Sequence, residues 1–176
     1  MKERGNLVAV RARTNRIGNR KRALTELFET VSLGAPEKAV GFVLWRVVHR
    51  YMREVDRALI TLDLTHLQFM TLAIAAWLGR AEEAVTQSDI AHSGDIHPMQ
   101  VSHMLKILEG KGMVARARSA SDVRAKHVEV TTTGLTVLRR ALPLVIDVQR
   151  RLFGEDGSVG GSLLVALRRL DREPMD

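Results

Sequence analysis

A segment near the middle of the chain, residues 98–110, carries side chains that could hydrogen-bond to the edges of nucleic-acid bases. Its apolar residues recur at positions i, i+3, i+4 and i+7, which predicts a helix with one buried stripe made of Val101, Met104, Leu105 and Leu108. On the opposite face we expect Met99, Gln100, Ser102, His103 and Lys106. Glutamine can pair with an adenine edge, lysine with guanine or phosphate, and methionine with a thymine methyl group. An ordinary solvent-exposed surface would look the same, so this helix alone does not decide between the two.

A short helix is predicted directly before this segment. Thr86-Gln87-Ser88-Asp89 has the pattern of a helix start, and Gly94 is a natural stop. Pro98 suits the first turn of the next helix, whose N-terminus would offer free N–H groups to a phosphate. Two short helices joined by a tight turn are typical of a helix-turn-helix, and Ser88 and Pro98 therefore join the candidate DNA contacts. Many helical hairpins share this spacing.

The residues after Gly112 alternate between apolar and polar types. "MVARARSA" places Arg116 and Arg118 on one face, and "AKHVEV" places Val128 and Val130 inward. Two such segments joined by the polar loop 119–124 predict a β-hairpin. Because an isolated hairpin is only marginally stable, it must lean on the helices. A hairpin that directly follows a helix-turn-helix is a wing.

Three stretches together carry a family resemblance: "VSHMLKILEGKGMV" at 101–114, Asp122-x-Arg124, and Val128-x-Val130-Thr131-x-x-Gly134. In this combination the sequence resembles the winged-helix regulators of the multiple antibiotic resistance regulator (MarR) family. Val130 stands where leucine is more usual in that family. The resemblance extends more loosely from about residue 37 to about residue 172. The wing motif is fairly specific because its order and spacing match, whereas the flanking helices are generic.

The resemblance implies a sequence-specific, DNA-binding transcriptional regulator, most simply a homodimeric repressor on a pseudo-palindromic operator. Arg124 at the wing tip would enter the minor groove of double-stranded DNA, where a narrow segment concentrates negative potential. Asp122 would hold Arg124 in place by a charge-assisted hydrogen bond. Arg116 and Arg118 would contact phosphates. The alternative for the Asp122–Arg124 pair is a surface ion pair that contributes almost nothing.

The fold class we expect is mainly α with a small β-hairpin wing. A winged helix-turn-helix core, about 64–133, is flanked by dimerisation helices at about 36–62 and 134–171. Pro36 should open the first long helix, Thr65-x-x-Gln68 should cap the next, and Pro143 should kink a later one. Residues 1–35 read as a flexible basic arm, in which Gly18 and Asn19 interrupt any helix and a short helix could run from 23 to 31.

A small aromatic or phenolic effector is a further expectation that comes from the resemblance. The candidate lining residues are Trp45, His49, His66, Phe69 and Met70, although aromatic residues and methionines at helical spacing are more often core. Zinc, which some family members bind, would need histidines on one face. The spacing of His92, His97 and His103 does not provide this, and His97 suits a helix cap better. We therefore predict no metal and no cofactor.

Composition agrees with a nucleic-acid partner. The net charge is +7 and the pI is near 10.5, which favours a polyanionic partner. The absence of cysteine excludes disulfides and a thiol-oxidation switch and fits a cytoplasmic protein. No apolar run is long enough to span a membrane, and no constellation of nucleophile, base or phosphate loop indicates an enzyme. The rivals to a sequence-specific regulator are a winged helix that binds nucleic acid without sequence preference and a protein-interaction or ligand-sequestering module.

Overall fold

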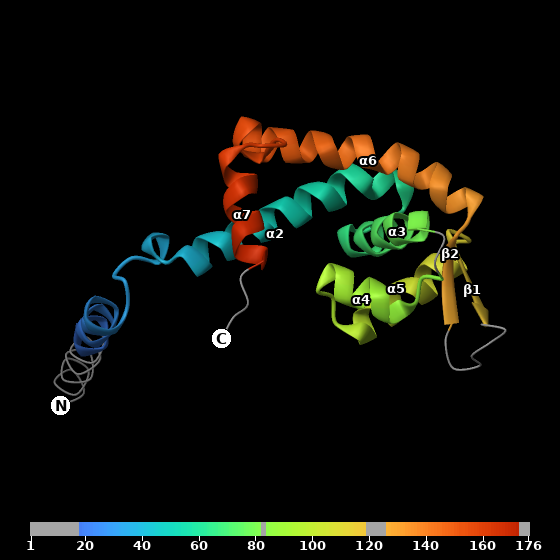
Figure 1. Ribbon diagram of the computed structural model, residues 1–176. Coiled ribbons are helices and arrows are strands. Elements are labelled where there is room, and N and C mark those ends of the chain that lie inside the picture. The colour runs from blue at the N-terminus through green and yellow to red at the C-terminus, as the bar shows by residue number, and fades with distance from the viewer. Residues whose placement is uncertain (1–17, 82–83, 119–125, 173–176) are drawn as a thin grey trace, which may run out of the picture. The chain divides into compact units, whose positions relative to one another are not determined.

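The computed structural model describes residues 18–81, 84–118 and 126–172 of the chain (Figure 1). Within these residues the protein is helical apart from one two-stranded antiparallel sheet. The chain divides into two units, one that ends at His49 and one that begins at Arg50. The first unit holds the start of the long helix α2, and the second holds its end together with all the following elements.

In the N-terminal unit, residues 18–31 are helical. The expected helix at 23–31 lies inside this stretch, and the prediction that Gly18 and Asn19 would interrupt a helix is wrong. Pro36 does not open the long helix directly, because it begins a separate 3₁₀ turn, η1 (Pro36–Lys38). The backbone of Ala39 is extended (φ −89°, ψ 109°) and its N–H closes back onto the Pro36 carbonyl. Helix α2 (Val40–Leu59) therefore begins four residues later than predicted.

The second unit contains the lobe predicted at about 64–133 and two further helices. After α2 a 3₁₀ turn, η2 (Ile60–Leu62), leads to the lobe. The lobe and the helices beyond it comprise α3 (His66–Leu78), η3 (Gly79–Ala81), α4 (Gln87–Gly94), α5 (Pro98–Gly110), β1 (Val114–Arg118), β2 (Lys126–Val130), α6 (Thr132–Phe153), η4 (Gly154–Gly157) and α7 (Ser162–Arg172). Helix α6 continues without a break through Pro143.

Local capping signals fix where the helices begin. Thr65 caps α3 in a complete capping box with Gln68, as predicted, and Thr86 forms a second box with Asp89. The hydroxyl of Thr131 accepts from the Gly134 N–H at the start of α6. The first two caps confirm the helix starts that were predicted at 65–68 and 86–89.

Helix α4 ends at Gly94, as predicted, and the left-handed residue that turns the chain is Asp95 (φ 47°). A Cβ atom at Gly94 would come within 2.7 Å of the Ile74 Cδ1 atom and 2.9 Å of the Ile96 Cδ1 atom. Both atoms lie at the ends of flexible side chains, so a larger residue at this position would require those side chains to move.

The predicted hairpin is confirmed. Val114 pairs with Val130 and Arg116 with Val128 across the antiparallel strands. The Val128 N–H also donates to the Val85 carbonyl at 2.7 Å, and Thr86 forms an isolated bridge with His127. The hairpin thus leans on the segment that precedes α4, which supplies the support that an isolated hairpin lacks.

One apolar core holds the lobe together, and all of its members belong to the second unit. Side chains from α2, α3, α4, α5, the hairpin and α6 contribute to it. Its fully buried members include Val55, Leu59, Leu72, Ile90, Val101, Leu105, Leu108, Ala141 and Val148. Burying this much apolar surface drives the packing of α5 onto α3, and the packing leaves the other face of α5 to solvent.

Candidate nucleic-acid interface

Helix α5 presents the outer face that its apolar spacing predicts. Val101, Leu105 and Leu108 are fully buried. The side chain of Met99 is 76% exposed on the opposite face. Of the other candidate contacts, Ser102 is half-buried, and the exposed ones are Ser88, Pro98, Gln100, His103 and Lys106. The candidates on α5 therefore share one accessible surface, with Ser88 on α4 beside it.

The N-terminus of α5 is capped from within the chain. Nδ1 of His97 accepts a hydrogen bond from the Met99 N–H at 3.2 Å, which confirms the predicted cap. The N–H groups of Gln100 and Val101 both donate to the His97 carbonyl, and Pro98 has no N–H. The prediction that this end offers free N–H groups to a phosphate is therefore wrong for the first four residues. Only the positive end of the helix dipole is left to attract an anion.

The wing places one predicted arginine against the lobe. Arg116 on β1 donates from Nε to Oε2 of Glu109 on α5 at 2.9 Å, and its Nη2 contacts the same oxygen. Its side chain is only 18% exposed. Arg118 lies on the same strand, but its side chain is outside the described residues, as are Asp122 and Arg124. In this structure Arg116 joins the wing to α5.

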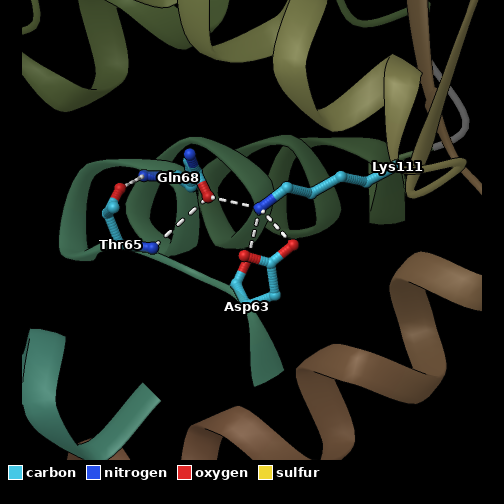
Figure 2. Close-up of polar contacts among 4 residues, drawn as sticks. All are labelled: Asp63, Thr65, Gln68 and Lys111. Carbon is cyan, nitrogen blue, oxygen red and sulfur yellow. Dashed lines mark hydrogen bonds and ion pairs between the residues drawn. The ribbon is translucent and has the colours of Figure 1, made fainter. Parts of the chain in front are cut away.

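The C-terminal end of α5 carries a polar cluster that the sequence analysis missed (Figure 2). Nζ of Lys111 lies 3.0 Å from Oδ2 of Asp63 and 3.2 Å from Oε1 of Gln68, and it also donates to the Asp63 carbonyl. Oε1 of Gln68 accepts from the Thr65 N–H as well, within the capping box. Because Lys111 and Asp63 are 48 residues apart, no local sequence pattern announces this contact.

Comparison with known proteins identifies the family. A model of the MarR family matches residues 64–126. YdcH of Bacillus subtilis, described as an uncharacterised HTH-type transcriptional regulator, is 32% identical over 118 residues, which is 67% of this chain and 80% of YdcH. The chain belongs to the MarR family. It is a transcriptional regulator rather than an enzyme, as the sequence analysis predicted.

Solved structures of similar fold support this family assignment. The repressor CouR bound to a 23-mer DNA duplex is 30% identical, with a TM-score of 0.66 over 77% of this chain and 94% of CouR. The Mycobacterium tuberculosis regulator MosR in complex with DNA is 26% identical, with a TM-score of 0.60 over 76% of this chain and 92% of MosR. CouR bound to p-coumaroyl-CoA is 28% identical, with a TM-score of 0.66 over 81% of this chain and 99% of CouR.

The residues predicted to line an effector site divide between the two units of this MarR chain. In the first unit, the rings of Trp45 and His49 lie with their centroids 4.2 Å apart and their planes tilted by 39°, and both residues are exposed. In the second, Phe69 is buried in the core and Met70 is partly buried against it. His66 meets the ring of Tyr51 edge-on, with centroids 5.7 Å apart. Burial lowers the pKa of His66, and the nearby carboxylate of Asp56 opposes this shift.

A cavity that the sequence analysis missed lies between α3 and α6. Its volume is about 400 Å³, and its lining is apolar apart from Arg80. The guanidinium of Arg80 sits 3.2 Å from the centroid of the Trp77 ring and donates from Nε to the Trp77 carbonyl. The full lining is Ala73, Ile74, Ala76, Trp77, Arg80, Leu138 and Leu142. None of the five predicted effector residues is among them, although Trp77 and Arg80 three residues later could have signalled the site.

Within the described residues, no group of three or more His, Cys, Asp or Glu side chains could hold a metal ion. No single helix in that part of the chain is long and apolar enough to cross a membrane. One pair of helical segments joined by a bend, Gly18–Leu62 and His66–Ala81, is long and apolar enough when the two are taken together.

Proposed function

We propose that this MarR-family regulator is a homodimeric repressor that binds a pseudo-palindromic operator through α5 in the major groove. The exposed outer face of α5 carries this proposal, because Met99, Gln100 and His103 can meet base edges while Lys106 meets guanine or phosphate. The net charge of +7 favours binding to DNA at physiological salt. CouR and MosR, whose folds are similar, were solved on DNA.

The wing extends this proposal to the minor groove. We expect Arg124 to enter the groove, with Asp122 orienting its guanidinium and Arg118 on a phosphate. Arg116 was predicted as a phosphate contact, but its ion pair with Glu109 and its low exposure favour another role. We assign Arg116 to holding the wing at a fixed angle to α5.

Apolar surface that the single chain leaves exposed supports the homodimer. At the start of α2, Val40, Leu44 and Val47 are exposed, Val40 by 85%. On α7 the exposed apolar side chains include Val165, Leu167 and Leu170. Exposed apolar side chains gathered on a helix are typical of an interface, and a second copy would cover them. Light scattering at micromolar concentration should give a dimer, and a monomer would contradict the proposal.

The proposed effector is a small aromatic or phenolic molecule, and its binding would release DNA. The apolar cavity beside Trp77 offers a flat aromatic surface, and Arg80 at its edge suits a carboxylate. The predicted set Trp45, His49, His66, Phe69 and Met70 is divided between the two units and stays a prediction. CouR was solved with p-coumaroyl-CoA, which shows that a similar fold accepts an aromatic acyl group.

Residues 1–35 are proposed as a basic arm that adds phosphate contacts. Eight arginines and lysines between residues 2 and 22 supply its charge, against one acid, Glu3. An operator on the chromosome would also require the protein to act in the cytoplasm, as its composition suggested.

Gel shifts at several salt concentrations test the proposed function against its rivals. The probes are a duplex selected from a random-sequence library by the protein and a shuffled duplex of the same length. A sequence-specific regulator binds the selected duplex about 10³-fold or more tightly than the shuffled one. A general nucleic-acid binder gives similar affinities for both, and a protein-interaction or ligand-sequestering module binds neither.

A further inference from the structure

The polar cluster around Lys111 joins two parts of the lobe that have different tasks. Lys111 is the C-cap residue of α5, the proposed recognition helix. Asp63 ends η2, and Thr65 and Gln68 begin α3, so these residues form the corner through which the chain leaves α2 and enters the lobe. One ammonium group therefore connects the end of the DNA-facing helix to that corner (Figure 2).

The Lys111 ammonium has one acceptor for each of its N–H donors. A lysine has three N–H donors and no acceptor, and Nζ of Lys111 contacts three oxygens: the Asp63 carbonyl, the Asp63 carboxylate and the Gln68 amide oxygen. The Lys111 side chain is 22% exposed and Gln68 is buried, whereas the Asp63 side chain is 88% exposed. Solvent weakens the ion pair with the carboxylate. The two neutral oxygens are therefore the main anchors, and the carboxylate adds a smaller contribution.

This anchor has the right position to set the angle of α5. The apolar side chains beneath α5 hold it to the lobe, but apolar attraction has no preferred direction. Hydrogen bonds are directional. Lys111 lies twelve residues beyond Met99, which is about 18 Å along a helix. Pivoting about that end by about 5° would move Met99 by about 1.5 Å, which is more than the roughly 0.5 Å that a preorganised site tolerates, and would move the base-facing residues nearer to Lys111 by less.

We propose that Lys111 is a positioning residue for DNA recognition, which orients α5 by tying its C-terminal end to the corner between η2 and α3. The inference rests on the proposed function, because it assigns Lys111 to sequence recognition. It competes with a plainer role for a lysine near DNA, in which the ammonium contacts a phosphate. The two roles predict different dependence on sequence and on salt.

The first experiment compares Lys111→Met with Lys106→Met, the same change on the exposed face of the same helix. The probes are the selected and shuffled duplexes, and binding is measured on folded protein well below each unfolding midpoint. We expect Lys111→Met to lose about tenfold in affinity for the selected duplex, with the shuffled duplex within about twofold and the salt dependence unchanged. Lys106→Met should instead reduce the slope of log K against log salt by about 0.9 if Lys106 contacts a phosphate.

Two further variants keep the proposal falsifiable if Lys111→Met folds poorly. Lys111→Arg retains charge and donors and should recover part of the lost sequence preference. Asp63→Asn suits the left-handed backbone at this position (φ 51°) and removes only the carboxylate, so we expect a drop of about twofold in the preference for the selected duplex. If Lys111 contacted a phosphate instead, Asp63→Asn would raise the affinity for both duplexes, because it removes a negative charge beside the lysine.

The outcomes separate the inference from the proposed function. An unchanged ratio of the two affinities in Lys111→Met would overturn the positioning role, as would parallel losses on both duplexes with a reduced salt slope. In either case the wild type would still prefer its selected duplex, and the proposed function would stand. A wild type that selects no sequence would overturn the proposed function and this inference together.

Discussion

Helices α5 and α7 both carry leucines at helical spacing, yet the structure treats them in opposite ways. On α5, Leu105 and Leu108 are completely buried within the lobe. On α7, Leu167 and Leu170 remain exposed, as do Val40 and Leu44 at the start of α2. An apolar stripe thus predicts that a face will be covered but not by what. The lobe closes its own core, whereas the apolar side chains of α7 and of the start of α2 stay exposed in the single chain, and in the proposed dimer a second chain would cover them.

The largest effect expected from this comparison is on stability. Leu105→Ala should cost about 2–5 kcal/mol of unfolding free energy, because it removes buried methyl groups and leaves a cavity. Leu170→Ala is the matched control on α7 and should change the stability of the dissociated chain by less than about 0.5 kcal/mol. Urea denaturation at low protein concentration measures both. Equal costs at the two positions would remove the distinction between the lobe and α7.

The second prediction concerns the chemistry of the wing. Arg124→Ala should cost about 1–3 kcal/mol of DNA-binding free energy and leave the unfolding midpoint unchanged. Fluorescence anisotropy with the selected duplex measures the first, and thermal unfolding the second. Arg116→Ala is the companion variant. It should lower the thermal midpoint, because it leaves Glu109 without the ion pair from β1. Unchanged DNA binding by Arg124→Ala would remove the wing from the mechanism.

The third prediction concerns the cap of α4, which lies wholly inside the lobe. Thr86→Ala should cost about 1 kcal/mol of unfolding free energy, since it removes the hydroxyl that accepts from the Asp89 N–H. The Asp89 carboxylate accepts hydrogen bonds from the hydroxyl and from the backbone N–H of Thr86. These bonds hold the pKa of Asp89 below its ordinary value, and the hydroxyl has the larger effect. The resulting stability is present above the ordinary pKa and lost as the pH falls below about 4.

Acid titration of stability checks this pH dependence. Because the Asp89 carboxylate is exposed, solvent keeps its contribution small. Thr86→Ala should flatten the loss of stability below about pH 4 relative to the wild type, and Asp89→Asn should do the same. If both variants still lost stability below about pH 4 as steeply as the wild type, the group that titrates would not be Asp89.

The smallest expected effect belongs to the basic arm. Removing residues 1–35 should weaken DNA binding and flatten its salt dependence, because each lost phosphate contact lowers the slope by about 0.9. Gel shifts over a range of salt concentrations measure this. The truncated protein should still prefer its selected duplex, since the residues that read bases lie in the lobe. An unchanged slope would show that the arm does not touch DNA.

The sequence predicted the elements whose determinants lie within a few residues of one another. The Thr65–Gln68 and Thr86–Asp89 boxes and the His97 cap each involve residues two or three apart, and all were found where expected. The buried stripe of α5 and the pairing of the wing strands followed from periods of 3.6 and 2.

What the sequence did not predict depends on contacts between distant residues. Lys111 meets Asp63 and Gln68 only because α5 folds back onto α3. The family resemblance implied a phosphate contact for Arg116, but the fold brings Glu109 within reach of it. The cavity beside Trp77 forms between α3 and α6, which are far apart in the chain. Periodicity indicates which face of an element is apolar or polar, and only the packing decides what that face meets.

Footprinting of the selected duplex at single-nucleotide resolution tests the central claim, that two copies of this lobe read one operator. The account predicts two protected half-sites related by a two-fold centre and separated by one helical turn, about 10–10.5 base pairs, or a multiple of it. A single protected half-site, or uniform protection without a centre of symmetry, would contradict it.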